Sequence, residues 1–93
     1  MKPDYIISTK VYAIHHQEGA FKLYISLHKD DFYYAGLSYY VKTGSWAAGE
    51  VLSIDMRLQQ YRGTSEEIVK RAALEWMEEN IKGEYTIELE RTI

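Results

Sequence analysis

Apolar and polar residues alternate with a period of two along four segments of the chain, which is the pattern of half-buried β-strands. In the second segment the apolar residues take every second position: Phe21, Leu23, Ile25 and Leu27. The third and fourth segments alternate in the same way, and the first is rich in Ile, Val, Thr and Tyr, which favour strands. We therefore predict four strands, over residues 5–16, 20–28, 32–42 and 51–58.

The connection between the first two segments predicts an antiparallel hairpin. Facing residues of a hairpin point to the same side of the sheet, so the length of the loop fixes the register. Residues 17–19 are predicted to form a three-residue loop in which Gly19 has a positive φ, as such loops need. This register places Ala13 opposite Leu23.

The next two connections extend the hairpin into a meander. Residues 29–31 fit a three-residue loop with Asp31 as its left-handed residue, which places Ile25 opposite Ala35. The connection at 44–49 joins strands of opposite parity, so it needs an even number of residues, and it has six. Three connections are thus consistent with one sheet.

One amphipathic helix follows the fourth strand. Thr64 is expected to be its N-cap, with Glu67 at the third helical position completing a capping box. The helix carries a wide apolar face: Ile68, Val69, Ala72, Ala73, Trp76 and Met77. Two further apolar residues lie outside this face and are expected to meet the tail or another subunit: Leu74 and Ile81. Gly83 ends the helix, and residues 84–93 alternate again, which predicts a fifth strand.

These elements predict an α+β fold: a four-stranded antiparallel meander, one amphipathic helix packed on one face, and a C-terminal fifth strand, in the order β-β-β-β-α-β. The only proline is Pro3 and no stretch is rich in Gly, Ser or Pro, so residues 1–93 are expected to form a single domain without a linker. Several single-strand-binding and regulatory folds share four strands followed by a helix. The fifth strand departs from that plan, and function does not follow from fold.

Composition narrows the function classes. The chain has no cysteine, which excludes disulfides, thiolate metal sites and cysteine nucleophiles, and favours a cytoplasmic location. The N-terminal residues include neither a signal peptide nor a membrane span, so no membrane partner is expected. Residues 1–63 carry seven Lys/Arg against six Asp/Glu, whereas residues 64–93 carry four against eight, so the acidic character belongs to the helix and tail.

No catalytic or metal site is expected. The three histidines do not converge in the predicted register: His15, His16 and His28. The adjacent acids at 30–31 and 66–67 fall in a turn and at a helix N-terminus, where acidic residues are locally favoured. A glycine-rich phosphate loop is missing, because the glycines of 44–49 precede a strand rather than a helix. We therefore expect no enzyme activity, no metal and no cofactor.

The second face of the predicted sheet carries the functional signal. It combines tyrosines with four Lys/Arg against one acid: Lys10, Tyr12, His16, Lys22, Tyr24, Ser26, His28, Tyr34, Ser38, Tyr40, Lys42, Ser53, Asp55 and Arg57. The predicted register sets Tyr12 opposite Tyr24. The candidate binding residues are the tyrosines and cations of this face together with a loop tryptophan: Tyr12, Tyr24, Tyr34, Tyr40, Lys10, Lys22, Lys42, Arg57 and Trp46.

Three interpretations of this face remain open. The leading one is a small non-enzymatic interaction or regulatory module that contacts another protein or, as a homodimer, a second copy. The alternative is a single-stranded nucleic-acid-binding protein, in which rings stack on bases and cations contact phosphates. The third is an ordinary solvated face, because tyrosine is a good strand residue and lysine discourages strand aggregation.

Overall fold

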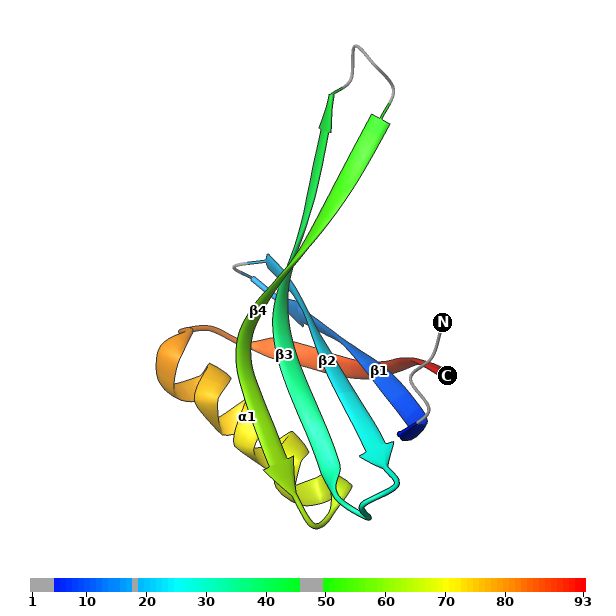
Figure 1. Cartoon of the computed structure of the whole chain (residues 1–93). Coiled ribbons are helices and arrows are strands. Elements are labelled where there is room, and N and C mark those ends of the chain that lie inside the picture. The colour runs from blue at the N-terminus through cyan, green and yellow to red at the C-terminus, as the bar shows by residue number, and fades with distance from the viewer. Residues whose placement is uncertain (1–4, 18, 46–49) are drawn as a thin grey trace.

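The computed structural model describes residues 5–17, 19–45 and 50–93, and the side chains of all of these except 40–45 and 50–55. The chain folds in the predicted order of elements (Figure 1). Their bounds are β1 (Ile6–His16), β2 (Gly19–His28), β3 (Tyr33–Ser45), β4 (Glu50–Gly63), α1 (Glu66–Asn80) and β5 (Tyr85–Thr92). The predicted α+β class and the fifth strand are therefore confirmed.

The five strands form one antiparallel sheet in the order β4-β3-β2-β1-β5. The C-terminal strand thus pairs with the N-terminal strand of its own chain. Helix α1 packs on one face of the sheet, against β2, β3 and β4 (Figure 1).

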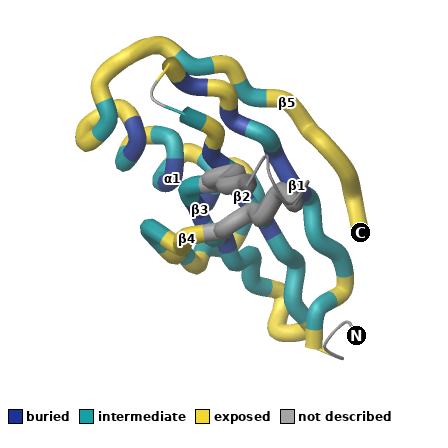
Figure 2. Tube along the Cα trace, turned by 90° about the horizontal axis from the view of Figure 1, so that it is seen from above, coloured by how far each residue is buried: buried dark blue, intermediate teal, exposed yellow. Residues whose placement is uncertain are grey.

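The core lies between α1 and the sheet. From the helix it takes Val69, Ala73 and Met77, which are all buried. From the sheet it takes mainly every second residue of the three middle strands: Tyr12, Ile14, Phe21, Leu23, Ile25, Ala35 and Leu37. Figure 2 shows the buried positions on α1 and on the inner strands, whereas β5 is largely exposed.

The predicted register of the first hairpin is wrong by one residue. His16 pairs with Gly19, so two residues rather than three connect the strands, and Leu23 lies opposite Tyr12 instead of Ala13. Gly19 does have a positive φ, of 151°. The observed register turns Ile14, which is 0% exposed, toward the helix in place of the smaller Ala13. Burying the larger apolar side chain favours this register.

The second hairpin matches its prediction, and the third matches it in parity. Asp31 has a φ of 68°, and Ile25 lies opposite Ala35. Ser45 pairs with Glu50, so four residues, and not the predicted six, connect the strands; this length is even, as predicted, and residues 46–49 lie outside the described chain. Strand β4 extends past its predicted end at residue 58 to Gly63.

Two irregular features shape the β3–β4 pair. Leu37 pairs with Gln59 while Ser38 pairs with Arg57, so Leu58 is the extra residue of a β-bulge. At the other end, β3 beyond Tyr40 pairs with β4 alone among the described strands. These residues form a two-stranded arm that projects from the body of the molecule (Figure 1).

The helix begins one residue later than predicted. Ser65, not Thr64, is the N-cap, and its hydroxyl accepts a hydrogen bond from the backbone N–H of Ile68 at 3.3 Å. The predicted apolar face is also too wide, because Ile68 is 54% exposed and Trp76 is only partly buried. Leu74 and Ile81, which the sequence placed outside that face, are partly buried against the core. Tyr85 and Ile87 are partly buried there as well.

Candidate functional site

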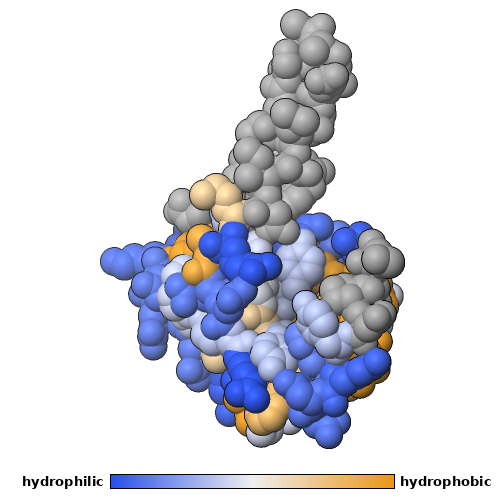
Figure 3. Space-filling view, in the orientation of Figure 1, coloured by the Kyte–Doolittle hydropathy of each residue, from blue (hydrophilic) through white to orange (hydrophobic). Residues whose placement is uncertain are grey.

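The face of the sheet opposite α1, called the open face below, is the counterpart of the predicted binding face. Strand pairing assigns to it, among residues with described side chains, Thr9, Val11, Ala13, His15, Ala20, Lys22, Tyr24, Ser26, His28, Tyr34, Gly36, Ser38, Arg57, Gln60, Arg62, Thr86, Glu88 and Arg91. The ion pair with Lys22 adds Glu90. Figure 3, in the orientation of Figure 1, shows surface of intermediate hydropathy between strongly hydrophilic patches on the body of the molecule.

Only part of the predicted site lies on the open face. Strand pairing brings four of the nine candidate residues together there: Lys22, Tyr24, Tyr34 and Arg57. The one-residue correction of the first hairpin moves Lys10, Tyr12 and the neighbouring His16 to the helix side. The remaining candidates lie outside the described side chains: Tyr40, Lys42 and Trp46.

On the helix side, Lys10 and Tyr12 have structural partners. The Lys10 ammonium lies 2.9 Å from a Glu66 carboxylate oxygen, and this hydrogen bond raises the pKa of Lys10. The Tyr12 hydroxyl donates to the other Glu66 oxygen at 3.3 Å, and the Lys70 ammonium lies 4.5 Å from the centre of the Tyr12 ring. Burial raises the pKa of Tyr12. These contacts tie β1 to the first turn of α1.

Charge on the open face is distributed unevenly across the strands. The described part that belongs to β2, β3 and β4 carries three cations and no carboxylate: Lys22, Arg57 and Arg62. On β5, Glu88 lies on this face by its pairing with Ala13, Glu90 by its ion pair with Lys22, and the cation Arg91 by its pairing with Val11. Lys22 reaches across β1 to Glu90 at 3.2 Å, and His15 lies 3.0 Å from Glu88. The described part of the face is therefore cationic toward the β4 edge, whereas at the β5 edge two carboxylates outnumber one guanidinium.

One row of paired residues crosses the whole sheet with this polarity. It runs through successive pairs from β4 to β5: Arg57, Ser38, Lys22, Ala13 and Glu88. The neighbouring row contains Gln60, Gly36, Tyr24 and Val11, and it ends at Arg91 on β5. A Cβ at Gly36 would lie 4.0 Å from the Arg57 Nε, so the guanidinium extends over the glycine. Small residues in these rows alternate with longer side chains: Ser38, Ala13 and Gly36 are small, whereas Lys22 and Tyr24 are long.

Aromatic rings and one guanidinium cluster at the far end of the open face. The His28 ring stacks on Tyr34 with centroids 4.0 Å apart, and Tyr5 lies 5.2 Å from His28. The Arg62 guanidinium carbon lies 3.8 Å from the centre of the Phe32 ring and 5.9 Å from that of Tyr34. Such contacts between cations and rings are favourable. They hold Arg62 in place at the edge of the sheet.

Asp30 anchors this cluster. Its carboxylate accepts a hydrogen bond of 2.6 Å from the Tyr34 hydroxyl and one of 2.9 Å from the backbone N–H of Phe32. These bonds favour the ionised carboxylate, so they lower the pKa of Asp30, with the Tyr34 hydroxyl as the main cause. The same bond raises the pKa of Tyr34.

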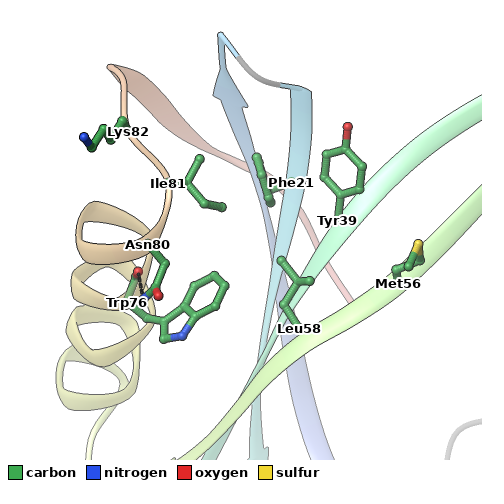
Figure 4. A pocket seen from close by; sticks show the side chains of 8 residues that line it. All are labelled: Phe21, Tyr39, Met56, Leu58, Trp76, Asn80, Ile81 and Lys82. Carbon is green, nitrogen blue, oxygen red and sulfur yellow. Dashed lines mark hydrogen bonds between the residues drawn. The ribbon is translucent and has the colours of Figure 1, made fainter.

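A second candidate site lies on the helix side, at the base of the arm. It is an open hollow of about 500 Å³, called the apolar hollow below, lined by Phe21, Tyr39, Met56, Leu58, Trp76, Asn80, Ile81 and Lys82. In Figure 4 the Trp76 indole extends from α1 toward Leu58, while the Lys82 ammonium points away from the hollow. The Asn80 side-chain amide donates to the Trp76 carbonyl at 2.9 Å. Six of the eight lining residues are apolar or aromatic, and the other two are Asn80 and Lys82.

Sequence reasoning missed two groups of residues in these sites. Gln60 and Arg62 follow the predicted end of β4, and the polar sequence of residues 59–63 gives little strand signal. Glu88 and Glu90 were implicit in the alternation of the tail, but only the strand order places them beside β1. The bulge at Leu58, which changes the parity of β4, has no sequence signature here.

Metal binding and membrane insertion can be examined for the described residues. Over 5–17, 19–45 and 50–93, no three His, Cys, Asp or Glu side chains come together as a metal site requires. In the same part of the chain, α1 falls short of the length and apolar character that a membrane-spanning helix requires. Comparison of the chain with protein-family models, curated proteins and solved structures found no match.

Proposed function

We propose that the protein is a small non-enzymatic interaction module that forms a homodimer through its open face. The observation that carries the proposal is the row from Arg57 to Glu88, which has a cation at one edge of the sheet and a carboxylate at the other. A surface with this polarity is complementary to a second copy of itself. The cysteine-free sequence supports a cytoplasmic location for the module.

In the proposed contact, the open faces of two copies face each other. The two-fold axis runs between them, parallel to β2, which is the central strand. It sets β4 of one copy over β5 of the other, so Arg57 meets Glu88 of the second copy at both ends of the row. Tyr24 then meets Tyr24 of the second copy at the centre, and Lys22 there is neutralised by Glu90 of its own chain. Five strands about 4.8 Å apart and about eight residues long cover roughly 600 Å² in projection, which is close to the area of a standard interface.

Charge reversal tests the proposal. Light scattering coupled to size exclusion should find the unmodified chain at twice its 10.9 kDa mass. Arg57→Glu and Glu88→Arg should each shift the protein to monomer, because like charges then face each other at both ends of the row. An equimolar mixture of the two variants should restore the dimer, since each acidic edge again meets a cationic one. Arg71→Glu, an exposed reversal on α1, is the matched control.

Two results would contradict the dimer. One is a monomeric unmodified protein at concentrations of several hundred micromolar. The other is a dimer that persists in both reversal variants, which would place the contact elsewhere on the molecule.

The aromatic cluster at the end of the open face favours one further function, binding of single-stranded nucleic acid. Tyr24, Tyr34 and His28 offer rings to bases, and Arg57 and Arg62 offer cations to phosphates. A labelled oligothymidine of twelve nucleotides serves as the probe. If this function holds, Arg62→Gln should weaken binding and reduce the slope of affinity against salt by about one unit. Binding that is absent at low salt would remove this candidate.

A further inference from the structure

Strand β4 has a free edge. It is the outermost strand on its side of the sheet, and along its 14 residues it pairs only with β3 in the described chain. The backbone N–H and C=O groups of such an edge can pair with an added strand. Strand β5 forms the other edge of the sheet, is 8 residues long, and carries Glu88, Glu90 and Arg91, which discourage pairing.

Helix α1 lies alongside the β4 edge. Its backbone approaches β4, β3 and β2 closely, with no comparable approach to β1 or β5 in the described chain. At one end of β4, a Cβ on Gly63 would lie 3.1 Å from the Ile68 side chain. At the other end, Trp76 lines the apolar hollow together with Leu58 and Met56. A strand added beside β4 would therefore have α1 next to it, as β4 does now (Figure 1).

The side chains along this edge are apolar and accessible. Met56 and Ile68 are each 54% exposed, and Leu58 and Trp76 are only partly buried. Met56, Leu58 and Trp76 line the apolar hollow between α1 and β4 (Figure 4), and Ile68 lies beside Gly63 at the other end of β4; these four residues are called the strip below. Tryptophan, tyrosine and methionine walls are typical of sites that take an anchoring side chain from a protein partner.

The bulge at Leu58 determines where an added strand can pair. A bulge interrupts the regular ladder, so pairing is expected along Gln59 to Gly63 and not across the bulge. The apolar hollow lies immediately beyond this segment, on the helix side. A strand that pairs up to the bulge thus directs its next helix-facing side chain into the hollow.

The charge beside the strip favours a basic partner. Glu75 and Glu79 are exposed on α1, and the last turn of the helix contains no basic residue. Glu79 follows Trp76 by three residues on α1, so both side chains lie on the same side of the helix, and the Glu79 charge adds to burial in raising the pKa of Tyr61 on β4. The negative end of the helix dipole adds to the field of these acids.

We propose that the β4 edge and α1 bind an extended segment of another protein, which adds a sixth strand to the sheet. Its helix-facing positions are apolar and cover the strip of Met56, Leu58, Ile68 and Trp76, with the largest of them in the apolar hollow. It is basic where it passes Glu75 and Glu79 of α1. The strip lies on the helix side of the sheet, so its side chains are not among those of the proposed dimer contact.

A defined peptide tests the proposal on the full chain. The probe is a labelled peptide in which valine, phenylalanine and valine alternate with threonine, with a lysine at each end. Fluorescence anisotropy should show binding, and hydrogen exchange should slow at the amides of residues 59–63. Methylating one alternate set of the peptide's amides should abolish binding, while methylating the other set should not, because only one edge of the peptide pairs with β4. Replacing both lysines of the peptide with glutamate should weaken its binding.

Variants of exposed residues locate the site without threatening the fold. Met56→Lys and Ile68→Lys should each weaken peptide binding at least about tenfold, as substitutions at an interface centre do. Leu89→Lys, which changes a 51% exposed residue on β5, is the matched control and should leave affinity within about twofold.

Several results would overturn the proposal. They are equal affinity of the two methylated peptides, protection at β5 instead of residues 59–63, and no binding of the peptide at 1 mM. Protection of 59–63 that appears with protein concentration alone would identify a second copy, and not another protein, as the occupant.

Discussion

At the scale of single residues, Gly19 shows how close packing and backbone conformation act together. Its φ is +151°, and a Cβ there would lie 2.8 Å from both the Cε2 and the hydroxyl oxygen of Tyr39. Gly19→Val should therefore lower the free energy of unfolding by about 1–3 kcal/mol, measured by urea denaturation. Ala20→Val, at the next and exposed position, should change it by less than about 0.5 kcal/mol. Equal effects of the two substitutions would contradict this account.

The hydrogen bonds of Asp30 predict how the stability of the fold depends on pH. Its folded pKa is lowered from the ordinary value of 3.8, mainly by the Tyr34 hydroxyl, so the hydrogen bonds stabilise the fold above that value. The contribution is lost as the pH falls through the lower, folded-state pKa. Tyr34→Phe should raise the pKa of Asp30 toward 3.8, measured by carboxyl NMR titration. Tyr33→Phe, on the helix side, is the control. An Asp30 pKa that does not change in Tyr34→Phe would show that the Tyr34 hydroxyl is not the cause of the shift.

At the scale of elements, the start of α1 offers a direct comparison of two adjacent hydroxyls. Ser65→Ala removes the hydroxyl that accepts from the Ile68 N–H, and should lower the free energy of unfolding by about 1 kcal/mol. Thr64→Ala, which the sequence alone marked as the cap, should cost less than about 0.5 kcal/mol. Thermal and urea unfolding of the two variants measure the difference. A larger loss of stability in Thr64→Ala than in Ser65→Ala would show that Thr64 is the N-cap, as the sequence alone predicts.

The elements also show how far the sequence alone leads. Strand β2 alternates cleanly, so its face and its pairing with β3 were predictable. Strand β1 was not, because both of its faces are apolar: Ile14 is 0% exposed on the helix side and Val11 is 0% exposed on the open face. Alternation could not choose between them, and the choice rested on a loop whose length was predicted one residue too long.

That one residue decided much of the candidate site. The corrected register places Lys10 and Tyr12 of β1 on the helix side. The faces predicted for β2 and β3 are unchanged, so the open face keeps Lys22, Tyr24 and Tyr34. Arg62 was missed for a different reason. It belongs to the polar end of β4, where pairing with Tyr34, and not strand propensity, maintains the strand.

At the scale of the whole molecule, the arm is separable from the body. Val41 pairs with Ile54, and beyond this pair the described strands of the arm pair only with each other. Replacing residues 42–53 with Asn-Gly, which suits a two-residue hairpin, should leave the body folded. The unfolding free energy should change by less than about 1 kcal/mol, and NMR shifts of β1, β2 and α1 should stay in place. A chain that no longer folds would show that the arm is part of the core.

The pairing of β5 with β1 has a consequence for how the chain reaches this structure. His15 and Glu88 are 73 residues apart in sequence, and Ile93 and Thr9 exchange backbone hydrogen bonds of 2.7 and 3.1 Å. The hairpins of the meander close short loops, whereas this last pairing must close nearly the whole chain, and non-local pairings of that kind slow folding. We therefore expect β5 to dock last. Until it does, β1 is a temporary edge at which two unfinished chains can exchange their C-terminal strands.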